Sequence, residues 1–262
     1  MKGRFPAPIL MLHHVDSEPV EPVPVFPDSY LTPEDFEGLL DLLESRGSTV
    51  LSLSDAVGRW RRGEKLPRRA VVLTFDDGYR CFAEHAWPAL RRRGWPATLF
   101  VVADLLGSTN LWDLEKGERQ EELLDASALR QLAAEGVDIG CHSMTHADLS
   151  ITDSEGISRE ISHAKKKLED ELGCPIDTFC YPYGRLSPAA AGAAREADFT
   201  AAVVIDAPSW AAPKDPFTLA REIITPRDSP FERKLKVSGG YRTWRKLPRL
   251  GILKALRNLA GR

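Results

Sequence analysis

Short apolar segments rich in β-branched residues alternate with amphipathic helical patterns along most of the chain. There are eight such segments, at residues 8–15, 49–53, 70–75, 98–102, 137–141, 179–182, 199–205 and 219–224. Strands that alternate with helices are typical of βα units around a parallel sheet. Seven or eight units in 262 residues predict an α/β fold with a closed or nearly closed (β/α) barrel.

Two helices are predicted from their capping sequences. Thr32-Pro33-Glu34-Asp35 combines an N-cap residue, a proline at N1 and an acid at N3, so we expect a helix from here to Gly47. Thr152-Asp153-Ser154-Glu155 indicates a capping box that opens a helix running to Gly173. No GxGxxG sequence follows an apolar segment, which argues against a dinucleotide-binding fold.

Composition narrows the class of protein further. With 43% hydrophobic residues, the chain can bury the core of one domain of this size. Its net charge of -3 gives no reason to expect a nucleic-acid partner, because a duplex binder normally carries a basic surface. Its four cysteines form no CxxC pair, and a chain of this length needs no disulfides to fold, so we expect reduced thiols.

The sequence as given suggests no export signal and no membrane span. The apolar stretch Ile9–Leu12 is too short for the core of a signal peptide. No segment approaches the roughly 18 apolar residues that a transmembrane helix needs. We therefore expect a cytoplasmic location.

Polar residues follow several of the predicted strands. Thr74-Phe75-Asp76-Asp77-Gly78 supplies two carboxylates and His142-Ser143-Met144-Thr145-His146 supplies two imidazoles. His13 and the segment 181–184 fall at equivalent positions, and the loops after strand ends carry the chemistry of α/β barrels. Aspartate and histidine are zinc ligands, and a catalytic zinc site uses three protein ligands and keeps one position open. The two aspartates and two histidines are four candidates for three ligand positions, so one carboxylate is not needed as a ligand.

Each fragment also has a purely structural interpretation. Asp-Gly pairs are common in turns, so Asp76-Asp77-Gly78 alone would indicate only a turn. A single histidine is usually structural, but two at i and i+4 beyond a strand favour metal ligands. Successive residues leaving a strand point to opposite sides, so one aspartate can bind a metal while the other stays free as a base.

The same fragments, followed by Phe179-Cys180-Tyr181-Pro182-Tyr183-Gly184, resemble the NodB-homology polysaccharide deacetylases, carbohydrate esterase family 4. The resemblance extends over about residues 8–235. It implies a distorted (β/α)7 barrel that removes N-acetyl groups from amino sugars with a divalent metal, usually zinc. It also implies that Asp76 is the catalytic base and that Asp77, His142 and His146 bind the metal.

This resemblance implies a mechanism of metal-assisted hydrolysis. A metal on the three ligands lowers the pKa of bound water and polarises the acetamide carbonyl, while Asp76 takes the proton as the water attacks. The backbone N–H of Tyr183 is the implied second stabiliser of the tetrahedral oxyanion. Tyr181 and Pro182 of the same motif are candidate supporting or substrate contacts. A tight turn at Tyr-Pro-Tyr-Gly is compatible with this role.

Two positions depart from the commonest pattern of the family. Many members have an arginine that orients the catalytic aspartate where this chain has Cys180. Many also take their general acid from a late Leu-x-His motif, where this chain reads Leu219-Ala220-Arg221. Without an acid, expulsion of the amine would be slow.

The first strand supplies a replacement for the missing acid. In a subgroup resembling the poly-N-acetylglucosamine deacetylases the acid histidine comes from this strand, and His13 matches its position. We therefore predict His13 as the general acid and His14 as a packing or surface residue that points the other way. Arg221 is the candidate partner that would keep Asp76 ionised in place of the missing arginine.

Other polar residues receive weaker assignments. Asp206 and Trp210 fall where family members place a loop that lines the acetyl pocket, so they are candidate substrate contacts. His85 and His163 lie in predicted helices without a second ligand, and we assign them no catalytic role.

The end of the chain is strongly basic. Residues 233–262 contain ten Lys or Arg and no Asp or Glu, and leucine recurs every third residue at 247, 250, 253, 256 and 259. Such a basic amphipathic helix suits an anionic membrane surface, although a terminal helix packed on the barrel is an equal alternative. We expect a barrel domain over residues 1–235 and a basic tail over residues 236–262. The membrane interpretation adds a peripheral location at the inner membrane face and a lipid-linked substrate.

Together these features predict a metal-dependent N-deacetylase that acts on an N-acetylated polysaccharide, oligosaccharide or glycolipid. One alternative is another amidase or an O-deacetylase that uses the same metal site. A second is an inactive carbohydrate-binding barrel, which Cys180 and the absent late histidine favour. Asp76 argues against the second, because a binding module needs no free base beside a metal.

Overall fold

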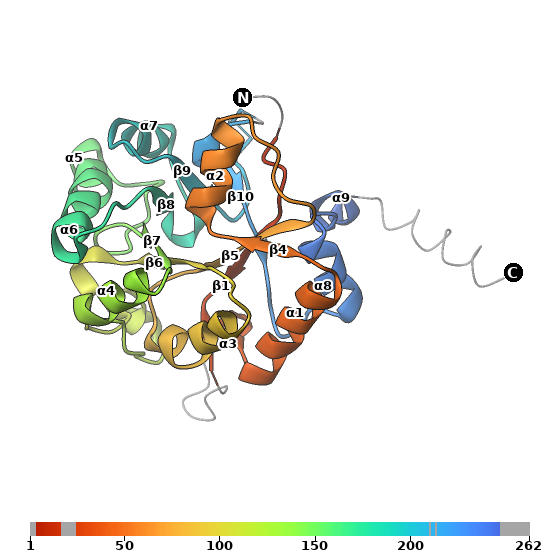
Figure 1. Cartoon of the computed structure of the whole chain (residues 1–262). Coiled ribbons are helices and arrows are strands. Elements are labelled where there is room, and N and C mark those ends of the chain that lie inside the picture. Colours follow the sequence, from red (N-terminus) through yellow and green to blue (C-terminus); the bar gives the residue numbers. More distant parts are fainter. Residues whose placement is uncertain (1–3, 17–24, 210, 213, 247–262) are drawn as a thin grey trace, which may run out of the picture.

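In the computed structural model, which describes residues 4–16, 25–209, 211–212 and 214–246, helices surround a sheet of parallel strands (Figure 1). The strands of this sheet are β1 (Ile9–Leu12), β4 (Thr49–Leu51), β5 (Ala70–Phe75), β6 (Thr98–Val101), β7 (Asp138–Cys141), β8 (Thr178–Cys180), β9 (Ala201–Val204), β10 (Leu219–Ala220) and β11 (Glu222–Ile223). A separate short pair consists of β2 (His14–Val15) and β3 (Tyr30–Leu31).

The order of the strands brings the two ends of the sheet together. The order is β10-β9-β8-β7-β6-β5-β1-β11, with β4 paired to the first half of β5. β10 pairs with β9, β11 pairs with β1, and only Arg221 lies between β10 and β11. The segment 219–223 therefore joins both edges, and the sheet forms the nearly closed α/β barrel that the sequence predicts.

The helices alternate with these strands. They are α1 (Pro33–Ser45), α2 (Leu53–Arg61), α3 (Trp87–Arg92), α4 (Ala126–Ala134), α5 (Ser154–Ser158), α6 (Ala164–Leu172), α7 (Pro188–Glu196), α8 (Pro230–Val237) and α9 (Tyr241–Arg245). Two π-helical turns are η2 (Phe82–Ala86) and η5 (Arg159–His163). The 3₁₀ turns are η1 (Pro27–Ser29), η3 (Ala103–Leu105), η4 (Leu111–Lys116), η6 (Pro182–Gly184) and η7 (Pro216–Thr218). Among the described residues, none of the helices has the length and apolarity that a bilayer span requires.

One of the two predicted caps is correct and the other is wrong by one residue. The Thr32 side chain accepts a hydrogen bond from the N–H of Asp35 at 3.0 Å and caps α1 as predicted. Before α5 the cap is Asp153, which accepts from the N–H of Gly156 at 2.8 Å. The Thr152 hydroxyl instead donates to the carbonyl of Asp148 in the preceding loop at 2.7 Å. The helical segment then runs through η5 and α6 to Gly173, as expected.

The inner face of the barrel changes from apolar to polar along the strands. Ile9, Val72, Phe100, Val203 and Leu219 form one buried cluster from alternate strand positions. Side chains two residues apart share a face of a strand, so Thr74 and Asp76 follow Val72 on the inner face, and Arg221 follows Leu219. The apolar floor thus continues into charged groups at the carboxyl ends of the strands.

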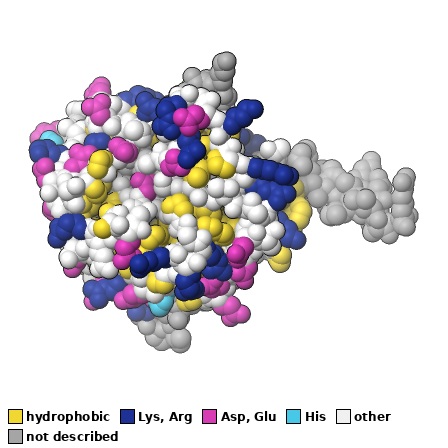
Figure 2. Space-filling view, in the orientation of Figure 1, with side chains coloured by type: hydrophobic (Ala, Val, Ile, Leu, Met, Phe, Trp, Pro, Cys, Tyr) yellow, Lys and Arg dark blue, Asp and Glu magenta, His cyan; other side chains and the backbone are white. Residues whose placement is uncertain are grey.

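The chain after β11 packs on the outside of the barrel. The expected boundary at residue 235 falls inside α8, which is joined to α1 by an ion pair of 2.9 Å between Arg233 and Asp35. Arg242 of α9 pairs with Glu222 at 3.1 Å. The predicted tail is therefore attached to the barrel over residues 236–246, and its leucine repeat from 247 to 259 lies outside the described residues. Basic and acidic side chains are interspersed over the face seen in Figure 2.

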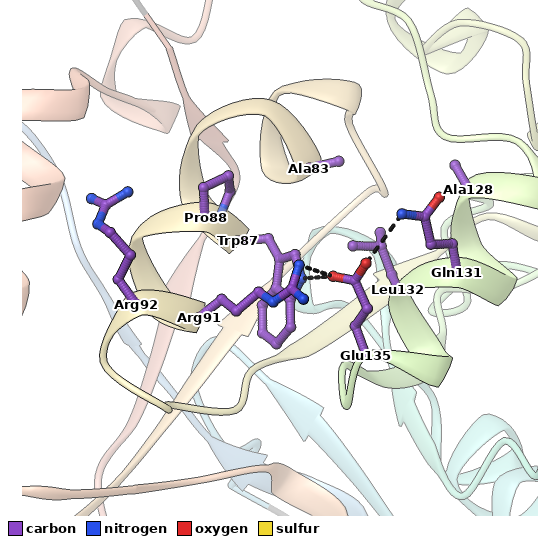
Figure 3. A pocket seen from close by; sticks show the side chains of 9 residues that line it. All are labelled: Ala83, Trp87, Pro88, Arg91, Arg92, Ala128, Gln131, Leu132 and Glu135. Atoms are coloured by element: carbon purple, nitrogen blue, oxygen red, sulfur yellow. Dashed lines mark hydrogen bonds and ion pairs between the residues drawn. The ribbon is translucent and has the colours of Figure 1, made fainter.

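A cavity of about 530 Å³ lies on the outer surface, between α3 and α4 (Figure 3). The Glu135 carboxylate extends across this cavity. It accepts hydrogen bonds from Trp87 Nε1 at 2.7 Å and from Arg91 at 3.2 Å. None of the predicted site residues lines this cavity. Arg92, which also lines it, pairs with Glu37 at 2.6 Å. The charged groups of this cavity therefore have partners, and we do not consider it a candidate active site.

Candidate active site

A second cavity, of about 310 Å³, gathers most of the predicted residues at the carboxyl ends of the strands. Its lining includes His13, Asp76, Asp77, His142, His146, Tyr181, Tyr183 and Arg221. Pro182 is buried in the adjoining η6 turn but does not line the cavity. Asp206 lines a different cavity, where Arg242 and Arg245 bind its carboxylate at 2.6 and 3.2 Å. Trp210 lies outside the described residues.

Asp77, His142 and His146 converge on one point, and we call these three residues the ligand side. Asp77 Oδ1 lies 3.2 Å from His142 Nε2 and 3.4 Å from His146 Nε2. Oδ1 is buried, yet it accepts no hydrogen bond from any residue that the structure describes. Zinc bonds of 2.0–2.2 Å at tetrahedral angles place ligand atoms roughly 3.3 Å apart. The three atoms therefore fit a divalent metal of this size.

Neighbouring groups fix the orientation of both histidines. His142 Nδ1 donates to the carbonyl of Cys180 at 2.8 Å, which directs the Nε2 lone pair toward Asp77. The ring of His146 stacks on Trp112 with centroids 4.4 Å apart. Burial disfavours the Asp77 anion, but the two histidine rings that face its carboxylate outweigh burial and hold the pKa of Asp77 well below its usual value. The ligand side is thus arranged as one carboxylate and two directed imidazoles.

The backbone around this cavity is strained. Four of the six non-glycine residues with positive φ in the described chain lie here: Asp77 (74°), Ser143 (69°), His146 (65°) and Tyr183 (58°). Left-handed backbone costs a non-glycine residue on the order of 1 kcal/mol. Such strain clusters at functional sites, where the surrounding structure holds it in place. The turn after Asp77 needs Gly78, because a Cβ there would lie 3.0 Å from Val101 Cγ1.

Asp76 has different surroundings, and we call Asp76, Arg221, Cys180 and His13 the base side. The buried Arg221 donates from Nη1 to Asp76 Oδ1 and from Nη2 to Oδ2, both at 2.6 Å. Burial disfavours the Asp76 anion, but Arg221 outweighs this and lowers the pKa of Asp76. The structure therefore contains the predicted Arg221–Asp76 pair.

Cys180 contacts this ion pair. Its Sγ lies 3.1 Å from Arg221 Nη2 and 3.6 Å from Asp76 Oδ2. The position at which many family members carry an arginine thus still touches the aspartate. In this chain the guanidinium reaches Asp76 from the segment between β10 and β11 instead.

The two adjacent histidines of the first strand region lie in different environments. His13 Nε2 is 4.0 Å from Asp76 Oδ2, and its side chain is 25% exposed. His14 is buried, stacked on Tyr30 and tilted against Tyr79, with ring centroids 4.0 and 3.8 Å away. Burial is the main cause that lowers the pKa of His14 to about 3. His14 is therefore a neutral packing residue in the cavity wall, and His13 faces Asp76.

Tyr183 is held by a loop that the sequence analysis did not single out. Lys116 of η4 donates to the Tyr183 hydroxyl at 3.2 Å and lies 4.6 Å from the ring centroid. Asp113 in turn binds Lys116 at 2.6 Å, and Trp112 covers His146. Nothing in the sequence of η4 indicates these contacts, because they depend on how the loop after β6 folds over the cavity.

Comparisons with known proteins show which family the sequence is similar to. The sequence model of the family described as polysaccharide deacetylase matches residues 63–202, just over half of the chain. The chain is 23% identical over 219 residues to YxkH of Bacillus subtilis, whose name places it among the polysaccharide deacetylases; the match covers 84% of this chain and 71% of that protein. It is 22% identical over 159 residues to the poly-β-1,6-N-acetyl-D-glucosamine N-deacetylase of Staphylococcus epidermidis, covering 60% of this chain but only 55% of that relative.

A solved structure shows the same fold. The deacetylase PplD of Streptococcus pyogenes, solved with acetate, superposes with a TM-score of 0.73 at 22% identity, covering 88% of this chain and 97% of that one. At this identity the similarity establishes the (β/α)7 type of barrel and nothing finer.

Proposed function

Since the chain belongs to the polysaccharide deacetylase family, we propose that it is a metal-dependent N-deacetylase of N-acetylated amino sugars. The observation that carries the proposal is the convergence of Asp77, His142 and His146 beside a separate buried carboxylate, Asp76, in one cavity. The names of the staphylococcal relatives make a β-1,6-linked polymer of N-acetylglucosamine the first candidate substrate.

The ligand side would hold the metal. One carboxylate and two imidazoles suit zinc, and three protein ligands leave a position free for water or substrate. When bound, such an ion polarises the acetamide carbonyl and lowers the pKa of water. Asp77 contributes negative charge, and His142 contributes a ring whose orientation the Cys180 carbonyl already fixes.

The base side would move the protons. Asp76, kept anionic by Arg221, takes a proton from the attacking water. His13, whose Nε2 lies 4.0 Å from Asp76 Oδ2, donates a proton to the amine nitrogen as the C–N bond breaks, which releases acetate and the free amino sugar. The backbone N–H of Tyr183 stabilises the oxyanion that forms on the former carbonyl oxygen.

The direct test is acetate release by the purified full chain from saccharides that differ only in their acetyl linkage. We expect acetate from β-1,6-linked N-acetylglucosamine oligomers, loss of release after chelation, and recovery when zinc is restored. Chitin oligomers test whether the β-1,6 glycosidic linkage is required. An O-acetylated oligomer with free amines tests whether the enzyme cleaves an acetyl ester instead of an acetamide. Release that chelation leaves unchanged would contradict the metal mechanism, and preferential release from the O-acetyl ester would identify an O-deacetylase.

The same assay tests the second alternative, the inactive carbohydrate-binding barrel. An inactive carbohydrate-binding barrel would bind the oligomers in calorimetry and release no acetate with zinc present. The Asp76–Arg221 pair favours catalysis, because an ionised carboxylate held beside three metal-ligand side chains has no use in simple sugar binding.

We also propose that the basic tail makes peripheral contact with an anionic membrane from the cytoplasmic side and brings the enzyme to a lipid-linked saccharide. The support is the sequence of residues 233–262, with ten basic and no acidic residues. Sedimentation with phosphatidylglycerol vesicles tests this, with phosphatidylcholine vesicles as the control. Equal sedimentation of the full chain and a chain ending at Lys246 would contradict it.

A further inference from the structure

The turn that carries His142 and His146 is held in place from outside the cavity. Two of its residues, Ser143 and His146, have left-handed backbone. The carbonyls of Ser143 and Met144 accept hydrogen bonds from the loop after β6 at 3.0 and 2.9 Å. The N–H of His146 donates to Ser143 Oγ at 2.9 Å. These contacts leave the N–H groups of Met144 and Thr145 to be satisfied by another part of the chain.

Both of these N–H groups donate to the side chain of Glu160. Its Oε2 accepts from Met144 at 3.0 Å and from Thr145 at 2.9 Å. Its Oε1 accepts from the Thr145 hydroxyl at 2.8 Å. One carboxylate thus binds two consecutive residues of the turn between the histidines.

Glu160 is a charged residue on a helical face whose other buried residues are apolar. It lies in the π-helical turn η5 beside buried apolar residues at 157, 161, 164 and 168, and only 5% of it is exposed. It forms no salt bridge with any residue in the described ranges of the chain. A buried carboxylate is costly unless it is hydrogen-bonded, so its contacts with the turn are what make this position tolerable. π-helical turns occur frequently at functional sites.

We propose that Glu160 is a positioning residue that presets the His142–His146 turn for metal binding. The inference rests on the proposed function, since it takes the two histidines as ligands. Glu160 does not face the metal position. It acts through the backbone of Met144 and Thr145, and thereby fixes the separation of the two imidazoles before an ion binds. Partners of this indirect kind typically change metal affinity by about 10–100-fold when they are mutated.

Two conservative substitutions separate geometry from charge. In Glu160→Gln, the amide oxygen can still accept both backbone N–H groups, and the amide nitrogen can donate to the Thr145 hydroxyl. In Glu160→Asp, the charge remains but the side chain is one methylene shorter and cannot reach both N–H groups. Glu155→Gln, at an exposed position of α5, is the matched control.

The experiment is titration of the metal-free full chain with Co²⁺, followed by its visible absorption, with Zn²⁺ competition for affinity. We expect Glu160→Asp to bind Co²⁺ about 10–100-fold more weakly and with an altered spectrum at saturation. Glu160→Gln and Glu155→Gln should stay within a few-fold of wild type and keep its spectrum. Circular dichroism of each metal-free protein verifies that the variants are folded.

Three results would overturn the proposal in distinguishable ways. Wild-type affinity and spectrum in Glu160→Asp would show that the contacts do not position the ligands. Weakening in Glu160→Gln but not in Glu160→Asp would show that the charge acts rather than the geometry. If the wild-type chain bound no Co²⁺ or Zn²⁺, the metal part of the proposed function would fail first, and this inference with it.

Discussion

Asp76 and Asp77 are neighbours in the chain and are almost equally buried, at 3% and 6% exposed, yet they have opposite surroundings. Both oxygens of Asp76 are bound by one arginine. Asp77 Oδ1 has no hydrogen bond from the described residues and faces two imidazoles. The difference shows that the surroundings of each carboxylate are set by the residues that other segments of the chain place opposite it.

The two sides of the site therefore differ in how their buried negative charge is compensated. The base side contains its own cation, Arg221, so its buried charge is compensated within the chain. The ligand side contains no permanent cation next to Asp77, so a bound metal ion is what would complete it. Four substitutions test this division, from the largest expected effect to the smallest.

Asp77→Ala should have the largest effect, because it removes the charged ligand. We expect the zinc content of the purified protein to fall from about one equivalent to near zero. Acetate release should fall roughly 10⁴-fold, since a metal contributes several kcal/mol of transition-state stabilisation. Metal analysis and the acetate assay measure both quantities. A variant that retained its zinc would show that Asp77 is not a ligand.

Asp76→Asn should reduce turnover about 10³-fold, because the amide cannot accept a proton from water. Zinc content should stay at the wild-type level, unlike that of Asp77→Ala. Loss of zinc in both variants would remove the distinction between the two sides.

His13→Ala should reduce turnover by about 10²-fold, because the leaving amine would lose its proton donor. The adjacent His14 serves as the control, since its neutral ring only packs between two tyrosines. We expect His14→Phe to keep most of the activity. Equal losses of turnover in the two variants would contradict the assignment of the acid to His13.

Arg221→Met should have the smallest effect, and one that depends on pH. Arg221 lowers the pKa of Asp76 against the effect of burial, so its removal should raise that pKa. A higher pKa leaves less of the base ionised at a given pH, so the acid limb of kcat/KM should move to higher pH. The rate should fall most in acid and approach the wild-type value at alkaline pH. Profiles that coincide would show that Arg221 does not act on the base, and circular dichroism shows whether each variant folds.

The sequence was sufficient for those parts of the site that lie at strand ends. Asp76 follows β5, His142 follows β7 and His13 follows β1, and each buried strand was visible as an apolar segment. The Arg221–Asp76 contact was also predictable, because a missing arginine in one motif suggested a replacement in another.

The supporting contacts could not be predicted in the same way. Glu160 lies in a helical segment, and its only sequence signal is an acid within an apolar stripe, which a surface residue at the edge of the stripe would also produce. Lys116 reaches Tyr183 across 67 positions of sequence. Such contacts depend on the packing of loops, which no periodic pattern encodes. The C-terminal boundary was also placed by charge alone, and α8 extends across it.

The late position of segment 219–223 in the sequence has a consequence for the order in which the parts of the site are synthesised. It closes the barrel and carries Arg221, whereas Asp76, Asp77, His142 and His146 all precede residue 147. A chain emerging from the ribosome therefore contains the three proposed metal ligands and Asp76 long before it contains the arginine that pairs with Asp76. Until this segment docks, the site lacks the guanidinium that binds both oxygens of Asp76. The base side is therefore complete only when the barrel closes.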